Sequence, residues 1–531
     1  MSKWTRRALL GSTISLGAVA VLPAATRASD SAAPIVRTSH GPVRGRVEDG
    51  VLAFRGLRYA APPTGSRRFK PPQPPASWTE VADAGQFGAA AIQSPGQPDM
   101  PDFETHSEDC VFLNVWTSSL NGTRPVMVWL HGGAFSTGAA GRPTYFGDHF
   151  ARDGIVLVSV NHRLNVFGYT QLPEDWGPEY ASSGMAGMLD IVAALKWVQA
   201  NIARFGGDAG NVTIFGESGG GAKVSLLMAM PAAKGLYHKA VIQSGAALDA
   251  APRPYAQALG SALMETLGVS SGDTAKLASI ETAKIFDVQD AAAAKVRSLA
   301  APGGFLNTGF VPSVNPVDLS HGPFTPDAPA MSARVPLLIG TNKDEATLFL
   351  TGNKDFLNQS SASFEEAVRK AYPAKAERLI PAIRKAFPDY SPPYLSAALM
   401  TAQMFWLNTI VLADRKVAQR AAPVYMYRMD WGSPINGGIL KAAHAMELSF
   451  VFGTYEAIRH FVGPGDGPAR MASQMHPAWV AFAKTGDPNH GGLPSWPAYD
   501  TKSRGTMIFD LKSRVENDPL SELRRMMGNP A

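Results

Sequence analysis

One serine in this chain lies between glycines at the junction of a predicted strand and a predicted helix. Residues 212–215 are three β-branched residues and a phenylalanine, which favours a short strand, and helix-forming residues follow at 223–230. Ser218 has Gly216 and Gly220 two positions to either side, so a sharp turn is sterically possible here. Such a turn projects a serine hydroxyl toward a general base. The sequence therefore predicts a nucleophile elbow.

The elements around this serine indicate a parallel sheet. Residues 155–160 form a continuous apolar run, typical of a strand covered on both faces. Residues 189–204 have apolar side chains at helical spacing and are stopped by Gly206. Because strand, helix and strand alternate here, we expect an α/β fold with a large, mixed, mostly parallel sheet flanked by helices. Further strands are predicted at 51–54, 109–116, 125–130, 240–243 and 336–340.

The remaining helical sequence reads as insertions into this fold. Alanine-rich stretches near 254–300 and 362–421 carry helical patterns, and no Gly/Ser-rich linker separates them from the rest. We therefore expect a single domain over residues 35–525, with helical insertions at these two places.

The charge balance argues against polyanionic partners. The formal net charge is +5, but four basic residues lie within the first 28 positions, which contain no acid. The rest of the chain is close to neutral and has no cluster of Lys and Arg of the kind that binds nucleic acid or anionic membranes. No clustered metal-ligand pattern is present either. We expect a small neutral molecule as the partner, and no cofactor or metal.

The first 28 residues have the layout of an export signal. A basic start is followed by an apolar stretch at 8–22 and by small residues at 24–28. Arg6 and Arg7 resemble the paired arginines of the twin-arginine type of signal, which exports folded proteins. We expect cleavage near Ala28 or Ala25, a periplasmic or secreted protein, and no stable insertion into a membrane.

Cys110 is the only cysteine of the chain, so no intramolecular disulfide can form. It lies in an alternating, strand-like segment, which predicts a buried and unreactive thiol. An exported chain of this kind has to rely on its hydrophobic core for stability.

A glycine loop follows the predicted strand at 125–130 and can supply an oxyanion hole. Backbone N–H groups in such a loop stabilise the tetrahedral oxyanion of ester cleavage. We assign the donors to Gly133 and Ala134, together with Gly219 immediately after the serine. His131 stands in the same loop, where a structural hydrogen bond is the favoured interpretation.

The general base and its acidic partner have to come from distant segments. His444 precedes an apolar segment that ends at a glycine and is the best candidate for the base, with His460, His476 and His490 as alternatives by position. The acid should follow a strand between the serine and the histidine. Asp344 and Glu345 both follow the strand predicted at 336–340, and the pattern does not choose between them.

The chain resembles the type-B carboxylesterases, the family that includes the cholinesterases. Ordered matches to this family lie at 54–60, 107–115, 131–135, 161–164, 205–208, 216–218, 342–345, 444 and 450–453. The resemblance implies the α/β-hydrolase fold and a serine carboxylesterase that works through an acyl-enzyme. It selects Ser218 over Ser244, Glu345 over Asp344, and His444 over the other histidines.

The resemblance also implies structural features and departures. Arg163 and Asp190 are expected to form a buried ion pair. The family usually has alanine where Gly219 stands, and the usual disulfide partner of Cys110 is replaced by Ala91. No tryptophan occurs between positions 91 and 110, where cholinesterases carry the one that binds quaternary ammonium groups by cation–π attraction. A choline-ester specialist is therefore not expected.

The substrate pocket is the least constrained part of the site. We expect Phe135, Phe310, Phe405 and Trp406 to line it, with core packing as the alternative for each. A non-catalytic recognition module is the alternative function from another class. Within the hydrolases, a lipase or an enzyme that cleaves amides, carbamates or lactones is also compatible with the same residues.

Overall fold

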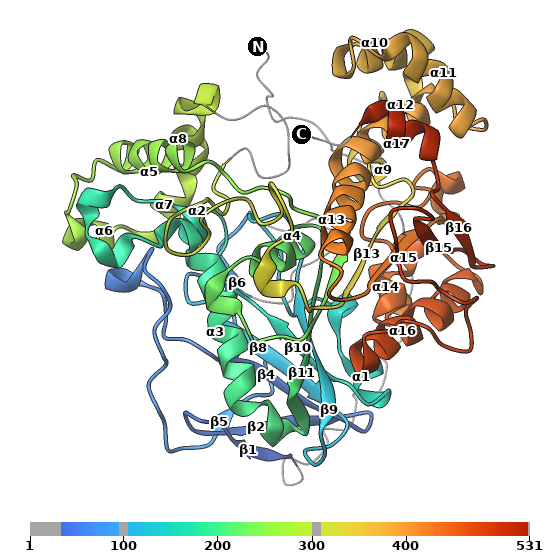
Figure 1. Ribbon diagram of the computed structural model, residues 1–531. Coiled ribbons are helices and arrows are strands. Elements are labelled where there is room, and N and C mark those ends of the chain that lie inside the picture. Colours follow the sequence, from blue (N-terminus) through green and yellow to red (C-terminus); the bar gives the residue numbers. More distant parts are fainter. Residues whose placement is uncertain (1–32, 95–104, 300–308, 529–531) are drawn as a thin grey trace, which may run out of the picture. The chain divides into compact units, whose positions relative to one another are not determined.

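The structure is a computed structural model that describes residues 33–94, 105–299 and 309–528 (Figure 1). Contacts divide the chain into two units, Met1–Ala33 and Pro34–Ala531, and all helices and strands of the described residues belong to the second. The export signal predicted for residues 1–28 lies outside the described residues.

A sheet of eleven strands forms the framework of the second unit, as far as the chain is described (Figure 1). The central strands of the sheet, from Val156–Val160 to Gly505–Phe509 in spatial order, are parallel to one another, and antiparallel strands complete both edges. This arrangement confirms the predicted α/β fold with a mixed, mostly parallel sheet. The spatial order is β16 (Arg514–Asn517), β15 (Gly505–Phe509), β14 (Val424–Met429), β13 (Leu337–Asn342), β12 (Lys239–Gln243), β11 (Gly207–Glu217), β9 (Arg124–Leu130), β10 (Val156–Val160), β8 (Phe112–Thr117), β4 (Val51–Arg58) and β3 (Arg46–Glu48).

Two small sheets accompany this large one. The first pairs β1 (Ile35–Arg37), β2 (Pro42–Arg44) and β5 (Ala82–Asp83), and the second pairs β6 (Ala90–Ala91) with β7 (His106–Ser107).

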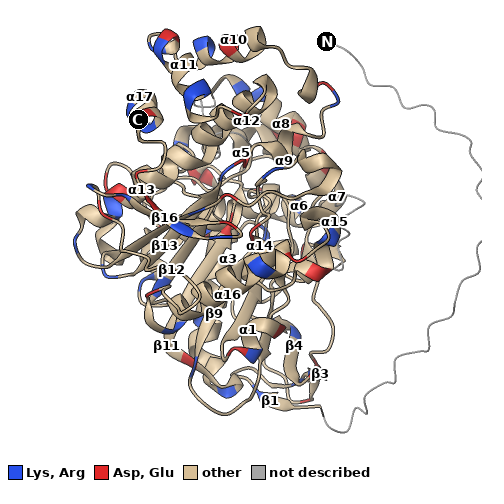
Figure 2. Ribbon diagram, turned by 90° about the vertical axis from the view of Figure 1, so that its right-hand side faces the viewer, with Lys and Arg blue, Asp and Glu red and all other residues tan. Residues whose placement is uncertain are grey.

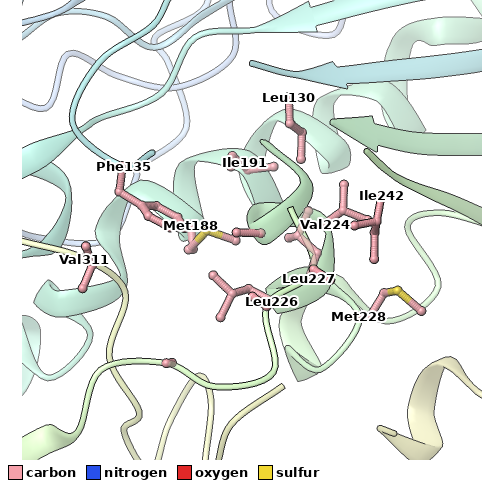
Figure 3. Packing of buried hydrophobic residues seen from close by; sticks show 14 of the residues in the cluster. Leu130, Phe135, Met188, Ile191, Val224, Leu226, Leu227, Met228, Ile242 and Val311 are labelled. Atoms are coloured by element: carbon pink, nitrogen blue, oxygen red, sulfur yellow. The ribbon is translucent and has the colours of Figure 1, made fainter. Parts of the chain in front are cut away.

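Helices cover both faces of the large sheet, so each central strand is apolar on both sides. Successive strand residues point to opposite faces: in β9, Val126 and Val128 belong to one hydrophobic cluster, whereas Met127 and Trp129 belong to another. The first cluster contains residues of α3 (Ala186–Asn201) and α4 (Gly219–Leu227), which converge with the strand residue Ile242 in Figure 3. The second contains residues of α1 (Asp148–Arg152), α14 (Leu448–Val451) and α16 (Gly467–Thr485).

Further helices occupy the connections before and after β13. Between β12 and β13 lie α5 (Arg253–Leu267), α6 (Thr274–Ser279), α7 (Thr282–Asp287) and α8 (Gln289–Lys295). Between β13 and β14 lie α9 (Thr347–Leu350), α10 (Ser361–Ala371), α11 (Ala376–Ala386), α12 (Pro392–Thr401) and α13 (Leu407–Ala418). The remaining α-helices of the described residues are α2 (Asn165–Tyr169), α15 (Arg459–Val462) and α17 (Ser521–Met527).

One helical run is apolar enough, by length and composition, to cross a membrane. A π-helical turn, Ala402–Trp406, joins α12 to α13, so the run extends over Pro392–Ala418. Most of its apolar window is buried inside the protein. The apolar side chains of this run are therefore used for packing.

Charged side chains of both signs are interspersed along the elements in Figure 2. On α10 and α11 they pair with one another, since Glu365 lies 3.3 Å from Arg369 and 2.9 Å from Arg384. Exposed pairs of this kind contribute little each, about 0–1 kcal/mol. Stability must therefore come mainly from the two hydrophobic clusters.

The predicted buried ion pair between Arg163 and Asp190 is confirmed. The guanidinium donates to the carboxylate twice, with Nε–Oδ2 2.8 Å and Nη2–Oδ1 2.7 Å, and the two side chains are 2% and 0% exposed. The pair joins the loop after β10 to α3. Removing one partner of such a pair typically costs about 3–5 kcal/mol, because the other charge stays buried.

The single cysteine lies just before β8 rather than within a strand, and it is buried. Cys110 packs with Ala91 and Leu164 in a small apolar cluster. Burial raises the pKa of the Cys110 thiol well above its usual value, so the thiol stays protonated and unreactive.

Candidate active site

The predicted catalytic segments follow the carboxyl ends of neighbouring parallel strands. The loop at 131–135 follows β9, Ser218 follows β11, and Glu345 comes three residues after β13. Since β9 pairs with β11, and β12 pairs with both β11 and β13, these strand ends lie along one edge of the sheet. This edge is the usual place for a site in a parallel sheet.

Ser218 lies at the tip of a strained turn between β11 and α4. Its backbone has φ 55° and ψ −122°, a conformation that is costly for a residue with a side chain. A Cβ at Gly220 would lie 1.9 Å from the carbonyl oxygen of Leu130, and a Cβ at Gly216 would lie 2.4 Å from the carbonyl carbon of Gly220. Both glycines are therefore sterically required, as expected for a nucleophile elbow.

The helix after Ser218 begins earlier than the sequence predicts. The prediction placed its start near Lys223, whereas α4 spans Gly219–Leu227. Glycine is a poor helix former, so the local pattern hid the first turn. Close packing against the strand ends selects glycine there and overrides its low propensity.

An imidazole and a carboxylate meet at this edge. His444 Nδ1 donates a hydrogen bond to Glu345 Oε2 at 2.5 Å, and Glu345 is fully buried. The other carboxylate oxygen of Glu345 accepts from the N–H of Asn342 at 2.6 Å and from Ser244 Oγ at 2.5 Å. These bonds fix the carboxylate, which in turn fixes the imidazole with its proton on Nδ1 and leaves Nε2 as the basic nitrogen.

The competing acid and serine have other partners. The carboxylate of Asp344 accepts hydrogen bonds from Tyr390 Oη at 2.6 Å and from the N–H of Ala442 at 3.3 Å. Ser244 donates to Glu345, so it supports the carboxylate.

The competing histidines also lie in other surroundings. His476 bonds the carbonyl of Val451 at 2.7 Å and Asp153 at 3.0 Å, on the side of α16. His490 bonds the carbonyl of Gln474 at 3.0 Å, and His460 is an exposed residue of α15. Of the four candidate histidines, His444 is the one that contacts Glu345.

Glu217 adds a buried carboxylate on the other side of the imidazole. His444 Nε2 lies 3.0 Å from Glu217 Oε1, although this oxygen accepts no hydrogen bond within the described residues. Burial alone would lower the pKa of His444, but the carboxylates of Glu217 and Glu345 outweigh it and raise the pKa to about 9. Burial raises the pKa of Glu217 to about 8, against the opposing charge of His444. The two groups therefore titrate together.

Replacing Glu217 by glutamine is expected to shift the pH dependence of kcat/KM. The negative charge of Glu217 holds a proton on His444, so its removal should move the acid limb of the profile to lower pH, by about one unit or more. The Asp344→Asn protein is the matched control, since its carboxylate bonds Tyr390 instead, and its profile should stay in place. An acid limb that is unchanged or moves upward in Glu217→Gln would contradict the coupling.

The hydroxyl of Ser218 makes no hydrogen bond within the described residues. Its own N–H donates to the carbonyl of Gln243 at 2.8 Å, which anchors the elbow to β12. His444 Nε2 reaches the adjacent residue, Glu217. The hydrogen bond between a catalytic serine and its histidine often tightens only when substrate is bound.

The glycine loop presents unpaired donors beside this turn. Gly133 and Ala134 have φ of 89° and 55°, and no described residue accepts a hydrogen bond from either N–H. Gly219 is the first residue of α4, so its N–H has no acceptor inside the helix. His131 Nδ1 donates to the carbonyl of Gly132 at 2.8 Å, the structural kind of role predicted for it. The three backbone donors can thus receive an oxyanion.

Aromatic rings flank the imidazole. The ring centroid of Phe405 lies 4.8 Å from that of His444, and that of Phe349 lies 5.2 Å away. Phe349 is 48% exposed, so this apolar wall is reachable from solvent. The sequence singled out Phe405 but not Phe349.

The other three predicted pocket residues lie elsewhere. Phe135 is buried against Tyr169, with centroids 5.3 Å apart, and Phe310 is buried in the first hydrophobic cluster. Trp406 lines a small cavity with residues of α11, α12 and α17, and none of Ser218, Glu345 and His444 lies in the wall of this cavity. Among the described residues, the aromatic rings in contact with His444 are those of Phe405 and Phe349, and not those of Phe135, Phe310 or Trp406.

Sequence reasoning gave no role to two buried carboxylates beside His444. Glu217 directly precedes Ser218 in the sequence, but its burial beside His444 arises only in the folded protein. Glu447 accepts from Asn342 Nδ2 at 2.6 Å and from Gln243 Nε2 at 3.1 Å, and burial raises its pKa to about 7. Its position three residues after His444 is the one signal that could have drawn attention to it.

Comparison with known proteins gives one consistent family. The model of the carboxylesterase family matches residues 32–525. The para-nitrobenzyl esterase of Bacillus subtilis (strain 168) is 36% identical to this chain over 501 residues, which cover 93% of this chain and 98% of that protein. The phenmedipham hydrolase of Pseudarthrobacter oxydans is 31% identical over 486 residues, which cover 90% of this chain and 94% of that protein.

Solved structures agree with this result. A carboxylesterase of Geobacillus stearothermophilus matches with a TM-score of 0.79 at 35% identity, covering 93% of this chain and 100% of that chain. A PNB esterase structure matches with a TM-score of 0.79 at 34% identity, covering 94% and 99%.

Proposed function

Because this chain belongs to the carboxylesterase family and is therefore a serine hydrolase of carboxylic esters, we propose that Ser218, His444 and Glu345 form its catalytic triad. The observation that carries the proposal is the 2.5 Å hydrogen bond from His444 to the buried Glu345, at the sheet edge where Ser218 emerges. This bond orients the imidazole and stabilises its charged form, which is what a serine nucleophile needs from its base.

In the proposed acylation step, His444 Nε2 removes the proton of Ser218 Oγ while Oγ attacks the ester carbonyl carbon. The carbonyl oxygen becomes an oxyanion and accepts hydrogen bonds from the N–H groups of Gly133, Ala134 and Gly219. The imidazolium then protonates the alcohol oxygen as the C–O bond breaks. The products are a free alcohol and an acyl group esterified to Ser218.

In the deacylation step, a water molecule takes the place of the alcohol. His444 removes its proton, the same three N–H groups stabilise the second tetrahedral intermediate, and the imidazolium returns a proton to Ser218 Oγ as the acid leaves. Glu345 keeps its hydrogen bond to Nδ1 throughout.

We propose esters of small neutral molecules as substrates. The side chains beside the imidazole are the apolar rings of Phe405 and Phe349, and the carboxylate that bonds it, Glu345, would repel an anionic group. The name of the para-nitrobenzyl esterase, which is 36% identical, makes para-nitrobenzyl esters suitable first substrates for a panel of acyl chains and alcohols.

Covalent labelling with a fluorophosphonate tests the nucleophile directly. The parent protein should lose its esterase activity and gain one phosphonyl group on the peptide that contains Ser218, located by mass spectrometry. The Ser244→Ala protein should still be labelled, and the Ser218→Ala protein should not. A label on another serine would reject the triad. So would a folded parent protein with neither label nor turnover, which is the result expected of a non-catalytic recognition module.

We also propose that residues 1–28 direct export through the twin-arginine route. The support is the basic start, the apolar stretch and the small residues at the end of this segment. The exported protein should begin near residue 26 or 29, and replacing both Arg6 and Arg7 by lysine should stop export by this route, whereas export that continues unchanged would reject it.

A further inference from the structure

A lysine is completely buried beneath the glycine loop. Lys223 belongs to α4, five residues after Ser218, and has 0% exposure. Its Nζ donates hydrogen bonds to the carbonyls of His131 at 3.0 Å and Ala134 at 3.2 Å, and it lies 5.4 Å from the ring centroid of Phe135. Lysine is almost never fully buried without such partners, so the position of this ammonium requires an explanation.

The two carbonyls that Lys223 binds enclose the oxyanion donors. The N–H of Gly133 belongs to the peptide group whose carbonyl is that of Gly132, and the N–H of Ala134 belongs to the peptide group of the Gly133 carbonyl. The carbonyl of His131 belongs to the peptide group just before these two, and the carbonyl of Ala134 belongs to the peptide group just after them. Lys223 therefore holds the loop on both sides of the two donors.

The carbonyls in between are also held. The Gly132 carbonyl accepts from His131 Nδ1 at 2.8 Å, and the Gly133 carbonyl accepts from the N–H of Thr137 at 3.0 Å. Four consecutive carbonyls thus have hydrogen-bond donors, while the N–H groups of Gly133 and Ala134 have no acceptor within the described residues. A peptide group held by its oxygen has its N–H direction fixed as well.

Gly219 leaves the room that this arrangement needs. A Cβ at position 219 would lie 2.0 Å from the carbonyl oxygen of Ala134, so this oxygen occupies the space that a methyl group would take. Residues 219 and 223 are four positions apart in α4 and therefore share one face of the helix. Lys223 binds the same Ala134 oxygen from one turn further along.

We propose that Lys223 is a positioning residue of the oxyanion hole, which fixes the N–H groups of Gly133 and Ala134 by binding the flanking carbonyls in the space left by Gly219. The proposal rests on the proposed function of these N–H groups. It does not depend on the charge of the lysine: burial lowers the pKa of Lys223 to about 7, but a neutral amine still carries two N–H groups, one for each carbonyl.

The test compares binding of substrate with binding of a transition-state analogue. A trifluoromethyl ketone places an oxyanion in the hole once a serine adds to it, whereas KM for an ester reports mainly ground-state binding. In Lys223→Met we expect kcat to fall about tenfold to a hundredfold, KM to change less than about threefold, and Ki for the ketone to rise by the same factor as kcat/KM falls.

Lys416 offers a matched control. It is also buried, on α13, and its Nζ donates to the carbonyls of Ser332 at 2.9 Å and Ala333 at 2.6 Å. Lys416→Met should lower the thermal unfolding temperature without changing Ki for the ketone. If Lys223→Met behaves in the same way, with Ki and kcat within about twofold of the parent values, Lys223 is merely structural and the proposal is overturned.

A second variant keeps the test decisive if Lys223→Met does not fold. In Gly219→Ala the added methyl would displace the Ala134 carbonyl, so Ki for the ketone should rise while KM changes little. Unchanged Ki would overturn the proposal. Failure of the proposed triad would show differently, because the parent protein itself would then neither bind the ketone tightly nor be labelled at Ser218.

Discussion

A protein in which Ser218 is replaced by alanine is expected to hydrolyse para-nitrophenyl acetate about 10⁵-fold more slowly than the parent protein. The substitution removes the oxygen that forms the acyl-enzyme, so the two-step reaction through a covalent intermediate is no longer possible. The three backbone donors remain, so a small acceleration over the reaction in water should survive. The value of kcat under saturating ester is the quantity to measure.

The fold should tolerate this change, which makes the result interpretable. The Ser218 hydroxyl makes no hydrogen bond within the described residues, so the thermal unfolding temperature should stay close to that of the parent. Ser244→Ala is the matched control. It removes a hydroxyl that donates to Glu345, worth about 1.5–3 kcal/mol for a bond to a charged group, and should cost at most about a hundredfold. A Ser218→Ala rate within tenfold of the parent rate would refute the assignment of the nucleophile.

The second large effect is expected from Glu345→Gln, which should lower kcat by about 10⁴-fold. The amide keeps the volume of the carboxylate and can still accept from Asn342 and Ser244, as Glu345 Oε1 does. Its NH₂ group then faces His444 Nδ1, where Glu345 Oε2 accepts a hydrogen bond. An NH₂ donor at that point forces the imidazole proton onto Nε2, and an Nε2 that carries a proton cannot accept the proton of Ser218.

The neighbouring acid provides the comparison for this variant. Asp344→Asn neutralises the adjacent carboxylate, but that carboxylate bonds Tyr390 and Ala442, so kcat should fall less than about tenfold. Equal losses in the two variants would mean that loss of charge, and not the tautomer of His444, explains the effect. A larger loss in Asp344→Asn would make Asp344 the acid.

The parts of the site that depend on local pattern were predictable from the sequence. The elbow is encoded by an apolar strand and by glycines whose Cβ atoms would collide with backbone, and both signals lie within ten residues of Ser218. The sheet followed from the alternation of strands and helices, and β12 and β13 lie within a few residues of their predicted positions. The start of α4 was placed too late, because packing and not propensity decides it.

The parts that depend on distant contacts were not predictable from pattern alone. Asp344 and Glu345 are adjacent and chemically alike, and only the fold brings one of them to 2.5 Å from His444. The burial of Glu217, Glu447 and Lys223 likewise arises from segments far apart in the chain. Of the four aromatic residues expected in the pocket, Phe405 contacts the ring of His444, whereas Trp406 lies in the wall of a cavity that contains none of the three proposed catalytic residues.

The lone thiol, enclosed by Ala91 and Leu164, has a consequence for how the chain matures. With one cysteine in the whole sequence, and that one protonated and buried, the native state has no disulfide within the chain that an oxidant or a disulfide isomerase would have to form. The packing of the core therefore does not depend on whether the surroundings are reducing or oxidising.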